Sequence, residues 1–374
     1  MTHNHLSEEM LAKVLQNRRL EDIDTAGVFD LVRGESAIEK FVPEGIVRVD
    51  PRDGAVVTFN SKRAKRPHTN TAVPRDEPED HGAECPICHG RTTGIIDVTP
   101  LSKGFTFINK NLFPIAHPQD AAPQDMARGE LPQGAGCSDS RGVHLLQWTS
   151  NYDERDWHNM PDADLAIVLD RLGALEHTLL FESGKRDQPA GHVVIIKNYG
   201  RLVGGSLAHG HQQILYTNVA PRHFCNNRRF QEQYGECFAD FMLRENPAQL
   251  AVRDYGPVVL MVPYFMRRPY NMLLAVKRTS CAYLHQLDDE ERTATAAAWK
   301  DAIQAIRAIM DAIDRPIAFN VTVHNGPGCG LYCEFLPYTQ EMGGFEQLGF
   351  WVCQGTPEGC AETLRETLGD APAD

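Results

Sequence analysis

The stretch 162-DADLAIVLDRLGALEHTLL-180, together with the run 192-HVVIIKN-198 that follows it, decides the fold class of this sequence. The longer stretch has the apolar spacing of one helix face, which is formed by Leu165, Val168, Leu169, Leu172 and Leu175. The shorter run is rich in β-branched residues and is typical of a strand. The two patterns therefore predict a helix that packs against a sheet.

The same order of elements occurs twice along the chain. The first copy consists of the strand 143–148, the helix 162–180 and the strands 192–198 and 209–217. The second copy consists of the strand 270–277, the helix 289–313 and the strands 318–325 and 331–339. This repetition implies duplicated halves, each a mostly antiparallel sheet with a packed helix, so the predicted fold class is α+β.

The repeat also sets the predicted domain limits. They are an N-terminal helical extension at 1–44, a first half at 45–220 and a second half at 221–374. The extension is expected to begin with a helix over 7–20 that Ser7 caps. Two polar stretches rich in Pro and Gly, 66–84 and 118–142, are predicted to be loops.

Composition excludes several classes of protein. The 374 residues suffice for one large core or two medium ones, and the formal net charge of -13 argues against general affinity for nucleic acid or an anionic membrane. No stretch approaches the ~18 uninterrupted apolar residues of a membrane span. The ten cysteines are scattered apart from one pair, which suits reduced thiols. We therefore expect a soluble cytoplasmic enzyme.

A run of polar residues on a predicted strand indicates where the chemistry lies. In 209-HGHQQ-213, His209, His211 and Gln213 alternate and so share one side of a strand. The preceding Gly204, Gly205 and Ser206 predict a turn whose backbone N–H groups can approach an anion. The alternative is an exposed strand face with incidental polar residues.

An imidazole beside a phosphate cradle suggests nucleophilic attack on phosphorus. A neutral histidine can form a nucleotidyl intermediate, provided that its other ring nitrogen donates its proton to a fixed acceptor. Gln213 is then placed to hold a non-bridging phosphate oxygen.

A pair of cysteines suggests a metal site. Cys85-Pro-Ile-Cys88 has the spacing of half a zinc knuckle, although two packed thiols are the alternative. Four-coordinate zinc needs two further ligands, for which His209 and His158 are the best candidates if His211 is the nucleophile. Three competing histidines stay open, namely His144, His177 and His192.

Jointly these motifs resemble the galactose-1-phosphate uridylyltransferase family, a branch of the histidine triad superfamily. The similarity runs from about residue 45 to the C-terminal end and is weaker after residue 220. It rests on five ordered segments: "VDPRDGAVVTFNSKRAKRP" at 49–67, "CPICHG" at 85–90, "FINKNLFPIAHP" at 107–118, "DWHNMP" at 156–161 and "KNYGRLVGGSLAHGHQQ" at 197–213. In the last segment Gly210 stands where the family usually has a proline.

The resemblance implies roles for individual residues. It makes His211 the residue that takes the nucleotidyl group and Gln213 its phosphate-orienting partner. The implied ligands of one structural zinc per chain are Cys85, Cys88, His158 and His209. Nucleotide or phosphate contacts are implied for Arg63, Arg66, Asn111, Asn198 and Ser206, and the turn itself predicts such contacts for Gly204 and Gly205. In relatives the Arg-bearing segment reaches an active site shared across a dimer, so a homodimer is expected.

The second half departs from the family pattern. Some relatives bind a second metal through a Glu after the active-site strand and a later His-x-His. Here 217-TNVAPRHF-224 lacks that Glu, and Tyr332-Cys-Glu334 replaces the His-x-His, which leaves only His324. No second metal is therefore predicted. The segment 343-GGFEQLGFW-351 resembles the family's sugar-contacting segment, with Phe345 and Glu346 at matching positions.

The residue at position 213, the third of the alternating polar positions 209, 211 and 213, favours one reaction class. Triad hydrolases keep a histidine where this chain has Gln213, so the pattern resembles the transferase and phosphorylase branch. A sugar 1-phosphate leaves with little protonation, and an amide can therefore replace an acid there. The leading prediction is transfer of a nucleoside monophosphate, with uridine the family default, from a nucleoside diphosphate sugar to a sugar 1-phosphate. The alternatives are a phosphorylase that uses inorganic phosphate and a nucleotide-binding sensor without turnover.

Overall fold

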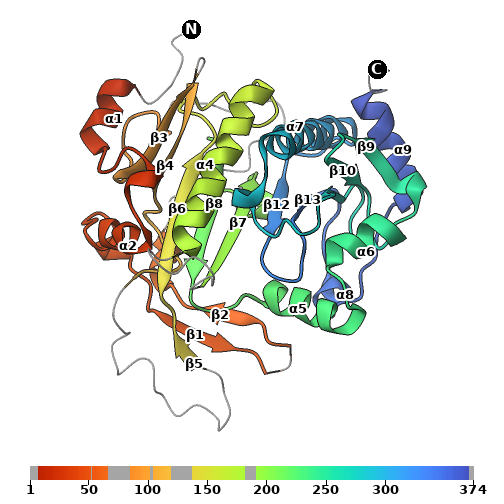
Figure 1. Ribbon diagram of the computed structural model, residues 1–374, viewed down its shortest axis with the longest axis horizontal. Coiled ribbons are helices and arrows are strands. Elements are labelled where there is room, and N and C mark those ends of the chain that lie inside the picture. Colours follow the sequence, from red (N-terminus) through yellow and green to blue (C-terminus); the bar gives the residue numbers. More distant parts are fainter. Residues whose placement is uncertain are drawn as a thin grey trace.

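A ten-stranded antiparallel sheet with the order β3-β4-β6-β8-β7-β12-β13-β11-β10-β9 runs through the molecule (Figure 1). The computed structural model describes residues 7–51, 53–65, 85–101, 104–118, 137–181 and 191–369. The first five strands are β3 (Ile95–Leu101), β4 (Gly104–Lys110), β6 (Gly142–Trp148), β8 (His211–Thr217) and β7 (His192–Tyr199). The other five are β12 (Phe319–His324), β13 (Tyr332–Pro337), β11 (Met272–Val276), β10 (Val258–Met261) and β9 (Ala251–Asp254).

The predicted duplication and the α+β fold class are confirmed. The order β6, α4 (Asp162–Leu180), β7, β8 recurs as β11, α7 (Asp289–Ala312), β12, β13. The two halves meet where β7 pairs with β12, with Tyr199 opposite Phe319. The domain limits at residues 44 and 220 stay a prediction.

Two long helices cover one face of the sheet and form the core with it (Figure 1). The helix α7 begins with a capping box, in which the Asp288 carboxylate accepts from the Glu291 N–H and the Glu291 side chain accepts from the Asp288 N–H. The ring of Trp157, in the turn that precedes α4, stacks on the ring of Trp299 on α7 with centroids 4.5 Å apart, and both are buried. Both halves therefore share one hydrophobic core.

A small sheet of order β2-β1-β5 lies apart from the large one. It comprises β2 (Val56–Thr58), β1 (Ile46–Val49) and β5 (Cys137–Asp139). The strand β5 lies in the stretch 118–142, which was predicted to be a loop, and it forms because it pairs with β1. The other predicted loop, 66–84, lies outside the described residues.

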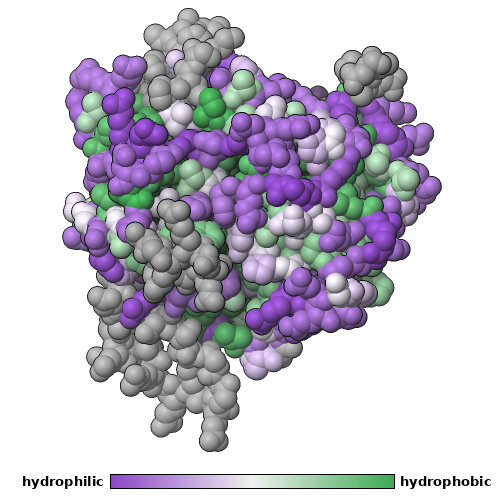
Figure 2. Space-filling view, viewed as in Figure 1, coloured by the Kyte–Doolittle hydropathy of each residue, from purple (hydrophilic) through white to green (hydrophobic). Residues whose placement is uncertain are grey.

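Shorter helices complete the fold. After β8 come α5 (Arg222–Tyr234) and α6 (Phe238–Glu245), and near the C-terminus α8 (Gly344–Gln347) and α9 (Pro357–Leu368). Figure 2 shows that hydrophilic side chains cover most of the face that carries α4 and α7. Among the helices of the described ranges, none combines the length and the apolar character that crossing a bilayer requires.

The N-terminal extension contains α1 (Glu8–Val14) and α2 (Thr25–Arg33). Ser7 caps α1 as predicted, because its hydroxyl accepts from the Met10 N–H at 3.3 Å. The helix ends at Val14 rather than near residue 20, because Leu15 forms a β-bridge with Ile95. A tertiary contact to the sheet thus replaces the last turn of the predicted helix.

An ion-pair group attaches this extension to the first half. The guanidinium of Arg171 on α4 lies 2.5 Å from Glu21 and 2.8 Å from Asp97. The hydrogen bond from Arg171 lowers the pKa of Glu21 to about 2. Because this folded-state value lies below the ordinary 4.5, the pair contributes its stability above about pH 4.5 and loses it as the pH falls towards 2.

We therefore expect Glu21→Gln to lower the free energy of unfolding at pH 7, and the difference from the parent to vanish as the pH approaches 2. Urea unfolding at a series of pH values measures this difference. Glu362→Gln, which alters an exposed carboxylate of α9, is the charge-matched control. A difference that persists undiminished at pH 2 contradicts the expectation.

Candidate functional site

The predicted nucleophile His211 is the first residue of β8 and is 6% exposed. Its Nδ1 lies 2.8 Å from the carbonyl oxygen of His209. A carbonyl only accepts, so Nδ1 carries the proton and Nε2 keeps its lone pair. Burial lowers the pKa of His211 to about 4, so the ring is neutral at pH 7. This is the protonation state that nucleophilic attack requires.

Trp148, which sequence reasoning did not single out, packs against both histidines of the motif. Its ring centroid lies 4.8 Å from that of His211 and 5.0 Å from that of His209. The indole N–H donates to the Asn109 side-chain oxygen at 2.9 Å, and the Asn109 amide donates to Thr93. Trp148 stands opposite His211 in the β6–β8 ladder, which explains its position.

A cavity of about 760 Å³ brings four of the predicted residues together. They are Asn111, Ser206, His211 and Gln213. Apolar residues including Ile87 and Phe113 line another part of it, beside Thr92, Thr93 and Arg91. A cavity of this size with a few converging polar groups is typical of a small-molecule site. A second cavity, of about 920 Å³, is lined by His177, one of the three competing histidines, and by none of the other predicted site residues.

The glycine turn before the histidines is held by its own backbone. Gly204 has the left-handed φ of 87°, which favours glycine. The Gly204 N–H donates to Arg201 at 3.1 Å, and the Gly205 N–H donates to Gly200 at 2.9 Å. Because both N–H groups are engaged within the turn, the predicted contact of these two residues with a phosphate stays a prediction.

The other predicted nucleotide contacts differ in their surroundings. The Asn111 side-chain oxygen accepts from the Phe113 N–H at 2.9 Å. The Asn198 side-chain oxygen accepts from Asn320 at 2.7 Å, across the junction of the two halves. The guanidinium of Arg63 donates to the Phe113 carbonyl, and Arg66 lies outside the described residues. Only Asn111 of these three described residues lines the 760 Å³ cavity.

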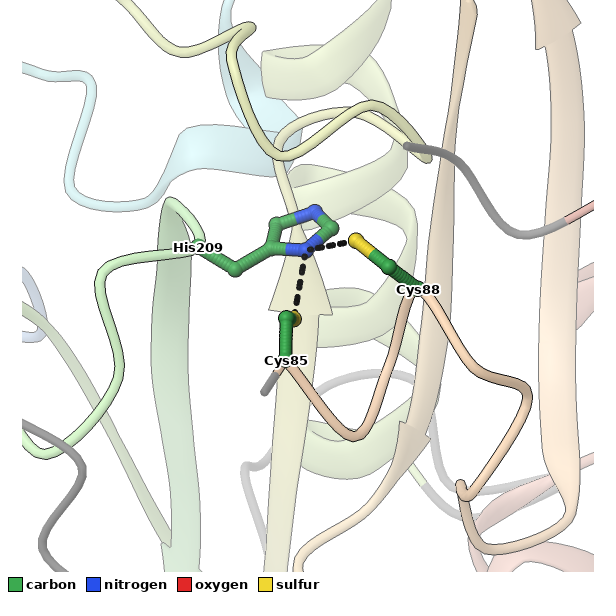
Figure 3. Close-up of side chains that lie close together, drawn as sticks. All are labelled: Cys85, Cys88 and His209. Carbon is green, nitrogen blue, oxygen red and sulfur yellow. Dashed lines mark hydrogen bonds between the residues drawn. The ribbon is translucent and has the colours of Figure 1, made fainter. Parts of the chain in front are cut away.

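Cys85, Cys88 and His209 converge on one point (Figure 3). The Nδ1 of His209 lies 3.5 Å from the Cys85 sulfur and 3.6 Å from the Cys88 sulfur. Its Nε2 donates to the Ser150 carbonyl at 2.9 Å, so the Nδ1 lone pair is directed at the sulfurs. Ligands about 2.3 Å and 2.0 Å from a tetrahedral zinc lie about 3.5 Å apart. The three side chains therefore fit a zinc ion.

The two thiols influence each other and a neighbouring carboxylate. The Cys88 thiol forms a hydrogen bond to the Cys85 sulfur. This bond lowers the pKa of Cys85 and raises the pKa of Cys88, as expected when two thiols share one proton. The Asp153 N–H also hydrogen-bonds to Cys88, and the negative charge of the Asp153 carboxylate acts on the same sulfur. Asp153 is 6% exposed, so a buried carboxylate lies next to the cysteines.

His158 does not belong to this group. Within the described residues, Cys85, Cys88 and His209 are the only set of three or more His, Cys, Asp or Glu whose ligand atoms all lie within 4.8 Å of one another. His158 lies ahead of α4, and its carbonyl accepts from Gln304 at 2.7 Å. Its role as a ligand, like the absence of a second metal, stays a prediction.

The three competing histidines lie in other surroundings. The Nδ1 of His144 accepts from the Ile115 N–H at 3.3 Å. His177 packs against His285, with ring centroids 5.1 Å apart. His192 begins β7 and packs against Phe224, with centroids 4.8 Å apart.

The predicted sugar-contacting residues lie on α8. The Glu346 carboxylate accepts from the Gly343 N–H at 2.7 Å and the Val352 N–H at 3.2 Å. Phe345 is 67% exposed. On β13, the Glu334 carboxylate lies 3.4 Å from the Nε2 of His324, so the residues that stand in place of the family's His-x-His include a carboxylate next to that histidine.

Comparisons with known proteins agree with the motifs. The chain is 25% identical over 363 residues to a galactose-1-phosphate uridylyltransferase of Cryptococcus neoformans, covering 86% of this chain and 90% of that protein. It is 22% identical over 356 residues to an ADP-glucose phosphorylase of Arabidopsis thaliana, covering 88% of this chain and 94% of that protein. No protein-family model matches the chain.

Solved structures show the same fold. A uridylyltransferase structure matches with a TM-score of 0.66 at 18% identity, covering 86% of this chain and 98% of that chain. The Arabidopsis thaliana ADP-glucose phosphorylase with bound ADP-glucose matches with a TM-score of 0.60 at 18% identity and the same coverage. The predicted resemblance is confirmed: the chain has homologues named galactose-1-phosphate uridylyltransferase and ADP-glucose phosphorylase, which are enzymes of the nucleotidyltransferase kind.

Proposed function

We propose that this protein transfers a nucleoside monophosphate, with uridine the default base, from a nucleoside diphosphate sugar to a sugar 1-phosphate. The observation that carries the proposal is the state of His211. Its Nδ1–H is held by the His209 carbonyl, and its ring lines a 760 Å³ cavity with Gln213. A neutral imidazole with a fixed tautomer is what a nucleotidyl-histidine mechanism needs.

The reaction is a double displacement. The Nε2 lone pair of His211 attacks the α-phosphorus, the bond from phosphorus to the bridging oxygen breaks, and the sugar 1-phosphate leaves with the electron pair. A phosphate oxygen of the second sugar 1-phosphate then attacks the same phosphorus and displaces His211. The hydrogen bond from Nδ1 to the His209 carbonyl stabilises the positive charge on the phosphorylated ring. Gln213 holds a non-bridging oxygen as charge moves.

We also propose one structural zinc per chain. Cys85, Cys88 and His209 supply three ligands, and the ion would fix the loop that ends at His211. Two donors compete for the fourth position. His158 is implied by the resemblance, and Asp153 contacts Cys88 through its backbone, but neither the His158 ring nor the Asp153 carboxylate belongs to the group whose ligand atoms lie within 4.8 Å of one another.

The phosphorylase is the second candidate, because one of the two named homologues is an ADP-glucose phosphorylase. Incubation with UDP-glucose, UDP-galactose or ADP-glucose, each with a hexose 1-phosphate or with inorganic phosphate, separates the two reactions. Transfer predicts a new nucleoside diphosphate sugar only with the hexose 1-phosphate. A nucleoside diphosphate formed only with inorganic phosphate identifies the phosphorylase, and binding without turnover identifies a sensor.

The proposed compartment is the cytoplasm. Nine cysteines within the described ranges are free thiols, which suits a reducing environment.

A homodimer is proposed as the active form, since apolar side chains around α8 are exposed: Phe345 by 67%, Leu348 by 86% and Phe350 by 69%. We expect the parent to sediment as a dimer and Leu348→Glu to sediment as a monomer at the same concentration. Ile313→Glu, which alters a 39% exposed residue after α7, is the control. A monomeric parent contradicts the proposal.

A further inference from the structure

A buried ion pair lies beneath the two histidines of the motif. The ammonium of Lys197 on β7 lies 2.8 Å and 3.0 Å from the two carboxylate oxygens of Asp156, and the side chains are 1% and 6% exposed. Asp156 also accepts a hydrogen bond from the Trp157 N–H, and it lies beside the Thr149 hydroxyl, which donates to the Gln212 side-chain oxygen at 3.1 Å. The carboxylate is therefore fixed in place by two donors, the Lys197 ammonium and the Trp157 N–H.

Gly210, between the two histidines, rests directly on this carboxylate. A Cβ atom built on Gly210 would lie 2.3 Å from the Asp156 Cγ and 2.5 Å and 2.6 Å from its two oxygens. Such approaches are far below van der Waals contact. The φ angle of Gly210 lies outside the left-handed region, so this position needs glycine for space and not for its backbone conformation.

Thr149 links the ion pair to the histidine segment a second time. Its backbone N–H donates to the Gly210 carbonyl at 3.1 Å, while its hydroxyl lies beside Asp156 and donates to Gln212, the residue after His211. The preceding residue, Trp148, stands opposite His211. The segment from His209 to His211 is thus held on one side by the strand ladder and packed on the other against the Asp156 carboxylate.

We propose that the Asp156–Lys197 pair is a positioning element for His211, and that Gly210 is the residue which lets the carboxylate lie against the backbone. The proposal rests on the proposed function of His211. Where relatives restrain the backbone with a proline, this chain restrains it by contact with a buried ion pair. A residue with a Cβ at position 210 displaces either Asp156 or the two histidines.

Gly210→Ala tests this positioning. We expect kcat to fall about 100-fold with KM nearly unchanged, because a displacement of about 1 Å has an effect of that order. In an Asp156→Gly/Lys197→Met background, the same substitution should lower kcat by less than about fivefold. Asp156→Gly removes the side chain that the new Cβ would meet, and Lys197→Met removes the charge that would otherwise be left unpaired. Gly34→Ala is the control, because a Cβ there meets its nearest neighbour at an ordinary 3.4 Å.

Two further readouts keep this test separate from the proposed activity. The free energy of unfolding of the four variants of the cycle should be non-additive, whether or not nucleotides turn over. If Gly210→Ala does not fold, the altered background should restore folding. The proposal would be overturned if Gly210→Ala lowered kcat and the free energy of unfolding equally in both backgrounds. It would also be overturned if Gly210→Ala in the parent kept full activity. A parent without turnover that still shows non-additive stability refutes only the proposed function.

Discussion

His211→Asn is expected to reduce nucleotidyl transfer by at least about 10⁴-fold, which is the scale of losing a nucleophile. The asparagine amide can still donate to the His209 carbonyl, so the fold should persist. The substitution removes the Nε2 lone pair and leaves no group to accept the nucleotide. After incubation with an α-labelled nucleoside diphosphate sugar, mass analysis should find the label on the peptide with residue 211 in the parent and nowhere in the variant.

His192→Asn is the matched control for this experiment, because His192 lies on the neighbouring strand β7 and outside the 760 Å³ cavity. The control should keep both turnover and the covalent label. A His211→Asn protein that turns over nucleotide sugars at the parent's rate would remove the basis of the mechanism. A label on another residue of the parent would instead reassign the nucleophile.

The second large effect concerns the metal. The purified parent should contain about one zinc per chain, and Cys85→Ser/Cys88→Ser should contain almost none, because a hydroxyl replaces each thiolate ligand. The thermal midpoint of the double variant should fall, and chelator should lower the midpoint of the parent but not that of the variant. Metal analysis by mass spectrometry and calorimetry measure these changes.

Cys225→Ser is the control, because Cys225 is a free thiol on α5 and not a member of the metal group. Zinc retained in the Cys85→Ser/Cys88→Ser protein would refute the ligand set. His158→Ala and Asp153→Asn then distinguish the two donors for the fourth position. The variant with the weaker zinc affinity identifies the ligand.

The fold was largely predictable because its signals are local. The period of the apolar residues in 162–180 gives α4, and the β-branched run gives β7. The helix predicted over 7–20 failed after Val14 because Leu15 bridges to Ile95, a contact from a distant segment. The pairing of β5 with β1 was missed for the same reason, since it joins residues about 90 positions apart.

The site was predictable only as far as its motifs reach. Cys85, Cys88 and His209 converge as expected, yet His209 precedes β8, which begins at His211. The alternation of a strand therefore relates His211 to Gln213 but not to His209. Trp148 lies in none of the quoted motifs, and Asp156 lies in 156-DWHNMP-161, which was singled out for His158; only the packed structure reveals their contacts with the histidine segment.

The junction of β7 with β12 has a consequence for the molecule as a whole. Without β12, the backbone donors and acceptors on that side of β7 would be open, two strands from β6 and directly beside β8. A fragment that ends before β12 would thus have an unpaired strand edge with which another chain could pair. The strand β12 thus covers an edge of β7 that would otherwise be open to pairing with another chain.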